Sequence, residues 1–435
     1  MPLRYAWYGD DFTGASDTLA TLAVAGRRAL LFLGAPTAAQ RAAAGPLDAL
    51  GIAGIARALA PEAMLSELAP VAACFAELAP AITHYKCCST FDSALGVGNL
   101  AVGVAALRRP DHDPVLTVLG GQPSLGRYCA FGELYATAQA GGEVHRIDRH
   151  PTMSRHPVTP MHEADLRRHL GALGLPRVGL VDLRALDAAA DDPDRLDAAV
   201  QRALAAEPEA LLFDATHDRH LHTLGRWLWQ RADQQPQLLL GASSVAQAAL
   251  AAWPDVAETP AAVGAVRAAS APVFLLVGSL SPVTAAQVQH AAGAYELVSV
   301  DPARLLSDAS ALEGLVRECD AALARGRSVL ACTTLPARGG PAPLDVARVS
   351  GDLLARVLAH NPQVRRVGVA GGDTSSLALR ALGAWALAWT GTLASGVALT
   401  RLHADDPSLD GLELMLKGGQ MGPPDLFLRL LHGTL

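Results

Sequence analysis

Short apolar runs alternate with alanine- and leucine-rich stretches along the first 251 residues. The runs have the length of strands, whereas the stretches between them repeat their apolar positions every three or four residues, as helices do. The predicted strands lie within LRYAWY (3–8), ALLFLG (29–34), ALGIAG (49–54), HYKCCS (84–89), PVLTVLG (114–120), RVGLVDL (177–183), ALLFDAT (210–216) and PQLLLGAS (236–243). This alternation is typical of βα units around a parallel sheet.

The pattern is interrupted between residues 251 and 272, where three prolines occur and no strand is evident. It then resumes with predicted strands in PVFLLVG (272–278), AYELVSV (294–300), RSVLACTT (327–334) and RRVGVAGG (365–372). We therefore predict two α/β domains with mainly parallel sheets and a ligand cleft between them. The predicted boundaries are a first domain over 1–250, a linker over 251–272 and a second domain over 273–435.

Composition argues against several classes of function. The 435 residues suffice for two domains, and a net charge of −7 without a basic, aromatic-rich stretch argues against nucleic acid as a partner. No run of 18 uncharged apolar residues suggests a membrane span, and the N-terminus lacks the apolar core of a signal peptide. The six cysteines form no C-x-x-C pair, so we expect reduced thiols and a cytoplasmic protein. Composition leaves homo-oligomerisation open.

The first polar cluster follows the first predicted strand, in WYGDDFTGASD (7–17). Ligands of open α/β sheets bind beyond the carboxyl ends of strands, where Asp10 and Asp11 stand. One aspartate can cap a helix that begins near Ser16. Because a cap needs only one acidic residue, we expect at least one of the pair to face the cleft and serve function.

Two further clusters lie in the first half. KCCSTFDSALGVGN (86–99) places Lys86 at a strand end before Ser89, Thr90 and Asp92, which suits a small polyhydroxylated anion or an ordinary turn. HRIDRHPTMSRHPVTPMH (145–162) holds four histidines and three arginines. Its prolines and positive charge disfavour a metal site, so we interpret it as an anion-lined or a solvated loop and assign no metal ligands.

Glycine-rich turns dominate the second half. AGGDTSS (370–376) joins a predicted strand to an amphipathic helix, where free amides bind phosphate or a capping aspartate closes the turn. VGSLSP (277–282) and LKGGQMG (416–422) are similar turns. The chain has neither the Walker A motif nor the G-x-G-x-x-G fingerprint, which argues against a dinucleotide-dependent dehydrogenase. Three such turns in one domain favour a nucleotide site.

Five of these motifs, GDDFTGASD, KCCSTFDS with a following GN, HPVTPM, GSLSPVTAAQ and AGGDTSSLALRALG, together resemble the four-carbon acid sugar kinase family in this order. The resemblance implies ATP-dependent phosphorylation of a small sugar acid, with the acid in the N-terminal domain and ATP in the C-terminal one. The motifs resemble most the branches acting on 3-oxo-tetronates or on the branched acid 3-oxo-isoapionate. A threonate or erythronate kinase is the alternative, as is a sugar-acid sensor without turnover.

The resemblance also implies site residues. The acid would meet Asp11, Arg57, Lys86 and Ser89, to which Asp10 is added by adjacency. The residues expected to contact ATP are Ser279, Gly371, Gly372, Asp373, Thr374 and Gly419. Mg²⁺ would bridge the ATP oxygens as in other kinases. Asp10, Asp11 and Asp92 all qualify as the general base by residue type, and of these we predict Asp11.

Overall fold

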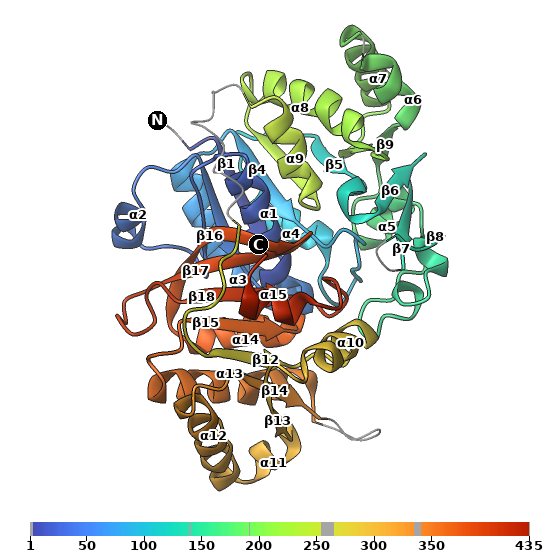
Figure 1. Ribbon diagram of the computed structural model, residues 1–435. Coiled ribbons are helices and arrows are strands. Elements are labelled where there is room, and N and C mark those ends of the chain that lie inside the picture. Colours follow the sequence, from blue (N-terminus) through green and yellow to red (C-terminus); the bar gives the residue numbers. More distant parts are fainter. Residues whose placement is uncertain (1–2, 139–140, 191, 254–264, 335–340, 435) are drawn as a thin grey trace. The chain divides into compact units, whose positions relative to one another are not determined.

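The chain divides into two compact units in the computed structural model, which describes residues 3–138, 141–190, 192–253, 265–334 and 341–434 (Figure 1). Unit 1 comprises residues 1–29 and 34–260, and unit 2 comprises residues 30–33 and 261–435. Both are built of helices around a mainly parallel sheet, so the predicted fold class of two α/β domains is confirmed. The predicted boundaries remain a prediction, and residues 254–264 of the linker lie outside the described residues.

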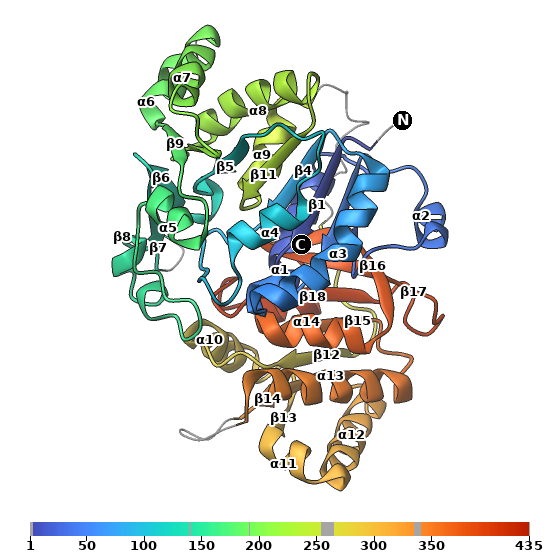
Figure 2. The same ribbon diagram turned by 180° about the vertical axis from the view of Figure 1, so that it is seen from behind.

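The main sheet of unit 1 is entirely parallel, in the order β3-β1-β4-β11-β5-β10-β9 (Figure 2). Its strands are β1 (Tyr5–Gly9), β3 (Ala49–Ala53), β4 (Ile82–Lys86), β5 (Leu116–Leu119), β9 (Val178–Val181), β10 (Ala210–Phe213) and β11 (Gln237–Gly241). The register aligns Gly9 of β1 with Lys86 of β4 and Lys86 with Gly241 of β11. Parallel pairing therefore brings the carboxyl ends of these strands, and the polar residues after them, to one edge.

Helices separate most of these strands, as the alternating pattern predicted. The α-helices of unit 1 are α1 (Phe12–Val24), α2 (Ala38–Ala44), α3 (Pro61–Leu78), α4 (Leu100–Leu107), α5 (Leu166–Leu173), α6 (Leu183–Ala189), α7 (Asp194–Leu204), α8 (Asp218–Ala232) and α9 (Ser244–Ala251). Short 3₁₀ helices are η1 (Ala56–Ala58), η2 (Pro123–Leu125), η3 (Ile147–Arg149) and η4 (Met153–Arg155). None of the helices in the described part of the chain is long and apolar enough to cross a membrane.

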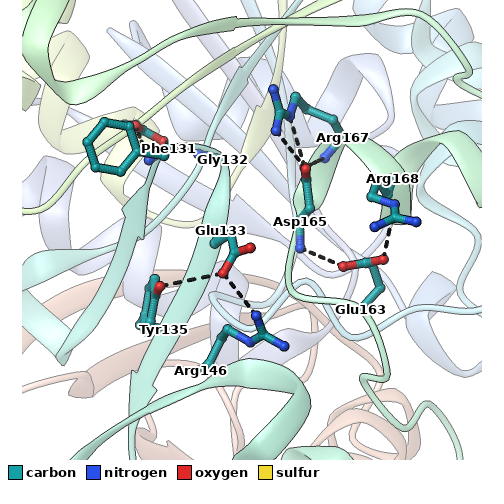
Figure 3. Close-up of polar contacts among 10 residues, drawn as sticks. Phe131, Gly132, Glu133, Tyr135, Arg146, Glu163, Asp165, Arg167 and Arg168 are labelled. Atoms are coloured by element: carbon teal, nitrogen blue, oxygen red, sulfur yellow. Dashed lines mark hydrogen bonds and ion pairs between the residues drawn. The ribbon is translucent and has the colours of Figure 1, made fainter.

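A small antiparallel sheet of β6 (Arg127–Ala130), β7 (Glu133–Thr137) and β8 (Val144–Arg146) was not predicted. Its strands are short and carry charged residues, so they lack the apolar runs of the main sheet. The β6–β7 turn holds Phe131 and Gly132 at positive φ, and their N–H groups donate to the buried carboxylate of Asp214 at 2.6 and 2.9 Å. Figure 3 shows this turn beside Glu133. The Glu133 carboxylate forms an ion pair with Arg146 and accepts a hydrogen bond from the Tyr135 hydroxyl.

The sheet of unit 2 has a parallel part and an antiparallel part. The parallel part runs β13-β14-β12-β15-β18 and consists of β12 (Val273–Val277), β13 (Glu296–Val300), β14 (Val329–Thr333), β15 (Arg366–Ala370) and β18 (Glu413–Lys417). β17 (Val397–Ala404), β16 (Ala384–Ala394) and β2 (Ala29–Phe32) then follow β18 as antiparallel neighbours. Of the strands in unit 2, the sequence predicted β12, β13, β14, β15 and β2, but not β16, β17 or β18.

Strand β2 belongs to unit 2 although it comes from the N-terminal part of the chain. Its residues Leu31 and Phe32 pair with β16, and the N–H of Leu33 donates to the carbonyl of Trp385 at 3.0 Å. The α-helices of unit 2 are α10 (Pro282–Ala291), α11 (Pro302–Ser307), α12 (Ala309–Ala324), α13 (Pro343–His360), α14 (Gly372–Ala381) and α15 (Leu426–His432). Apolar residues of β12, β17 and α15 contribute to a buried core of unit 2.

Candidate functional site

The paired aspartates stand in the turn from β1 to α1. Asp11 is the N-cap of α1, and its Oδ1 accepts a hydrogen bond from the N–H of Gly14 at 2.5 Å. The prediction that the helix begins near Ser16 was wrong, since α1 begins at Phe12. The cap itself explains the earlier start, because the carboxylate satisfies an N–H group of the first helical turn.

Two cations complete the cluster. Arg57, in η1, forms an ion pair with Asp11, with 2.5 Å between Nη1 and Oδ2. Lys86, the last residue of β4, is 4% exposed, and a Cβ added at Gly14 would lie 1.6 Å from its Nζ. Only glycine at position 14 therefore leaves the ammonium its present place beside the turn. The structure thus brings Asp10, Asp11, Arg57 and Lys86 together, as the sequence predicted.

The two carboxylates differ in their surroundings. Burial, followed by the negative charge of Asp11, raises the pKa of Asp10 to about 7, and its buried Oδ1 has no hydrogen-bond partner among the described residues. Burial also acts to raise the pKa of Asp11, but Arg57, Lys86 and the Gly14 N–H outweigh it and lower that pKa. Near neutral pH, Asp11 is a fixed anion and Asp10 can gain or lose a proton.

The segment after β4 carries a second layer of polar contacts. Thr90 donates to Asp92 at 2.5 Å, and Thr159, in the HPVTPM segment, donates to the other oxygen of Asp92 at 3.3 Å. Asp92 thereby links its own motif, KCCSTFDS, to the HPVTPM segment, which lies far away in the sequence. Ser89, a predicted site residue, lies half-buried in the same turn. The next residues include Phe91, which is fully buried with φ at 54°, a strained conformation for a side chain of this size.

The histidine-rich segment is held together internally. His150 accepts hydrogen bonds from the N–H groups of Thr152 and Met153, and His156 accepts from the N–H of Thr159. Arg146 is paired with Asp148 and Glu133, so this arginine is already neutralised. These contacts make the segment a structured loop in which histidines brace the backbone.

One group of side chains in the described residues has metal-ligand geometry, Asp187 with His217 and His220. His220 Nδ1 accepts the N–H of Thr216 at 3.2 Å, which places its proton on Nε2. Nε2 then donates to Asp187 at 3.0 Å. A metal at Nε2 would need the lone pair that this tautomer lacks, so the contacts favour a hydrogen-bonded triad.

In unit 2, the predicted nucleotide residues meet where β12, β15 and β18 end. The N–H of Ser279 donates to Ala370 at 3.1 Å, and the N–H of Gly371 donates to Lys417 at 2.9 Å. An added Cβ at Gly371 would lie 3.1 Å from Thr374 Oγ1, and one at Gly419 would lie 2.7 Å from Ser279 Oγ. These three turns therefore form one cluster.

The start of α14 has the backbone form expected of an anion site. Gly371 is its N-cap with φ at 131°, a conformation that favours glycine, and no side chain caps this helix in the described part of the chain. Gly372 and Thr374 lie in the first turn, so their backbone sits at the positive end of the helix dipole. Asp373 lies there too, but its side chain is outside what the structure describes.

Two protein-family models match the chain. A sugar-binding N-terminal domain covers residues 5–249, and a nucleotide-binding C-terminal domain covers residues 274–427. The chain belongs to the four-carbon acid sugar kinase family. It is accordingly a sugar acid kinase, and the resemblance inferred from the five motifs is confirmed.

Members of this family are similar to the chain over its full length. A 3-oxo-isoapionate kinase from Paraburkholderia graminis is 36% identical, covering 100% of this chain and 95% of the relative. A 3-oxo-tetronate kinase from Methylobacterium radiotolerans is 31% identical, covering 99% of both.

Two solved structures share the fold. The putative tRNA synthase of Salmonella typhimurium aligns with a TM-score of 0.78 at 23% identity, covering 99% of this chain and 98% of the other. Protein HI1011 of Haemophilus influenzae aligns with a TM-score of 0.70 at 22% identity, covering 98% of both.

Sequence reasoning missed the buried partners of these sites. The contact of Asp92 with Thr159 was not predicted, because Thr159 lies 67 residues away and no local pattern links the two. Lys417 was seen only as part of a glycine-rich turn. The one signal that marked it was a lysine ending an apolar strand in a buried sheet, the position that Lys86 also occupies.

Proposed function

We propose that the chain transfers the γ-phosphoryl group of ATP to a hydroxyl of a small oxidised sugar acid, either 3-oxo-isoapionate or 3-oxo-tetronate. The observation that carries this proposal is the Asp10 carboxylate in unit 1, which is buried, flanked by two cations, and has no hydrogen-bond partner for Oδ1 among the described residues. A sugar acid offers both groups that such a cluster can bind: a carboxylate for the cations and a hydroxyl for the free carboxylate oxygen.

Lys86 and Arg57 are the residues that we propose bind the acid. Both are cationic and stand beside the strand ends, and the half-buried Ser89 adds a hydroxyl nearby. Asp11 orients Arg57 through their ion pair and caps α1, so it contributes to binding by holding the arginine. Such preorganised charge is the main requirement of phosphoryl transfer.

Asp10 is the general base in this proposal. The sequence predicted Asp11, which stays untested, but Arg57 and Lys86 lower the pKa of Asp11 and make it a weak proton acceptor. The pKa of Asp10, at about 7, matches the proton affinity that a base needs near neutral pH. Its unpartnered Oδ1 could accept the hydroxyl proton as the oxygen attacks phosphorus.

The nucleotide would bind in unit 2, at Ser279, Gly371, Gly372, Thr374 and Gly419. The support is the convergence of these turns and the uncapped N-terminus of α14, where phosphate oxygens can accept backbone N–H groups. Mg²⁺ would accompany ATP and neutralise phosphate charge.

The substrate can be chosen by a direct assay. ADP release from ATP and Mg²⁺ is measured with 3-oxo-isoapionate, 3-oxo-tetronates, threonate and erythronate as acceptors. We expect the highest kcat/KM with 3-oxo-isoapionate, because its kinase is the more similar of the two relatives described. A higher value with threonate or erythronate would replace the proposed substrate, and ATP binding without turnover on any acid would favour a sensor.

The division of labour between the units has its own test. Lys86→Ala should raise the KM for the acid while leaving ATP affinity nearly unchanged, because Lys86 belongs to the unit 1 cluster. Asp373→Ala should do the reverse. ATP titrations by calorimetry, together with acid KM values, distinguish the two variants; equal loss of ATP binding in both would contradict the assignment.

A further inference from the structure

Lys417 ends β18 directly before the glycine-rich turn 418–422, and its side chain is fully buried. Its Nζ donates to Thr284 Oγ1 and Gln287 Oε1, each at 2.7 Å, and lies 3.5 Å from the carbonyl oxygen of Gly419. An ammonium has three N–H groups and no acceptor, so these three oxygens use its full donor capacity. Lys417 is thus held in one position.

No ion pair of the Lys417 ammonium is found in the described part of the chain. Within the described residues its hydrogen-bond partners are all neutral oxygens, and the ring of Phe427 lies 5.7 Å from Nζ. Burial lowers its pKa to about 8, which leaves the ammonium largely protonated at neutral pH. A buried, unpaired cation costs folding free energy, so a function outside folding is the natural reason to keep it.

Both side chains that accept hydrogen bonds from Lys417 also contact the glycine-rich turn. Thr284 donates to the carbonyl of Gly419 at 3.0 Å and lies 3.2 Å from Ser279 Oγ. Gln287 Nε2 lies 3.0 to 3.1 Å from the carbonyl oxygens of Met421, Gly422 and Pro423. The amide of Gln287 is oriented by Lys417, because its Oε1 accepts the ammonium while its Nε2 faces the turn.

These contacts fix the direction of the peptide groups in the turn. In a trans peptide the C=O of one residue and the N–H of the next point to opposite sides. With the carbonyls of Gly419 and Met421 directed at the buried network, the N–H groups of Gln420 and Gly422 point away from it. Outward N–H groups on a glycine-rich turn are the donors that a phosphate needs.

We propose that Lys417 is a positioning residue for the nucleotide: through Thr284, Gln287 and the carbonyl of Gly419 it holds turn 418–422 in its anion-binding form. This inference rests on the proposed function, since it takes the turn to be part of the ATP site. Its uncompensated charge also favours an anion bound above the turn. The contacts of Lys417 described above all lie within unit 2, so we expect its effect to be on the nucleotide.

The test compares KM values in Lys417→Met, which keeps the length of the side chain and removes its charge and donors. Loss of charge-assisted hydrogen bonds to the turn should raise the KM for ATP by about tenfold, with the KM for the acid within about twofold. Gln287→Met, which breaks the link to the carbonyls but keeps the charge, should raise the KM for ATP by a smaller factor. This second variant decides the question if Lys417→Met does not fold.

Arg366→Met is the matched control. Arg366 is a buried cation at the opposite end of the same sheet, paired with Glu413 and bound to the carbonyls of Arg267 and Leu430. It should lose thermal stability with its KM for ATP unchanged. The inference is overturned if Lys417→Met keeps the wild-type KM for ATP, or if both substrates' KM values rise equally. Wild-type protein that binds no ATP in calorimetry would instead refute the proposed nucleotide site itself.

Discussion

Lys86 and Lys417 occupy equivalent places in the two units and yet have opposite surroundings. Each is buried and ends a parallel strand at the edge where ligands bind. Lys86 stands with Asp10 and Asp11, whose charges outweigh its burial and raise its pKa. Lys417 has only neutral oxygens as hydrogen-bond partners in the described part of the chain, and burial lowers its pKa.

The difference fits the ligands that we propose for the two sites. A cluster of mixed charge can hold a sugar acid, because it offers cations to a carboxylate and a carboxylate to a hydroxyl. A cation surrounded by dipoles favours a polyanion, since no resident anion competes for its field. Two lysines at one kind of position can thus serve two different substrates, and their partners decide which.

The largest effect expected from this comparison is the loss of kcat on substitution of Asp10. Asp10→Asn should lower kcat by about a hundredfold to ten-thousandfold, because the amide cannot take up the hydroxyl proton. Steady-state ADP release with saturating substrates measures it. Asp214→Asn is the control: this buried carboxylate accepts three backbone N–H groups, so its loss should lower the melting temperature and spare kcat. A kcat for Asp10→Asn close to wild type would leave Asp10 without a chemical role.

The two lysines should differ in their contribution to stability. Lys86→Met leaves Arg57 as the remaining cation beside the two buried carboxylates of Asp10 and Asp11, and should lower the free energy of unfolding by about 3 kcal/mol. Lys417→Met removes a charge that has no ion-pair partner and should cost less than about 1 kcal/mol. Urea unfolding followed by fluorescence compares them. Equal losses in the two variants would mean that the charge environments do not differ as described.

A smaller effect is expected from pH. With its pKa at about 7, Asp10 is protonated in acid, so kcat/KM for the sugar acid should fall as pH drops below 7 and level off above it. An unfolded aspartate has a pKa of about 4, so between these values the folded state holds a proton that the unfolded state has lost. Asp10 should therefore lower stability as pH rises toward 7. Kinetic and thermal profiles over this range check both statements, and a flat kinetic profile would contradict the role of Asp10.

The fold was predictable where apolar runs are long and bounded. All eight strands predicted in the first half are present, because each contains a short, largely apolar run and most of them are buried. Strands β16 and β17 escaped because small and polar residues interrupt them, as in WALAWTGTLASG, and their register contains bulges. Periodicity cannot detect such strands, since their pairing is decided by neighbours distant in sequence.

The site was predictable as a set of positions and not as a set of roles. The family motifs named Asp11, Arg57 and Lys86, which the structure brings together. The assignment of roles needs burial and partners. Asp10, added only by adjacency, has an oxygen without a partner in the part of the chain that the structure describes, whereas Asp11 caps a helix and forms an ion pair. No sequence pattern reports which of two adjacent carboxylates is left unpaired.

The short strand β2 makes the two halves of this kinase less modular than their family models imply. Residues 30–33 lie early in the gene, but they supply a strand that pairs with β16 of unit 2. A recombination event near residue 250 that exchanged the second half for that of a relative would therefore keep the old β2 strand with a new β16. Evolution of nucleotide or acid preference by shuffling whole domains is constrained to partners that accept the ALLF strand beside β16, so residue-by-residue change within each site is the easier route.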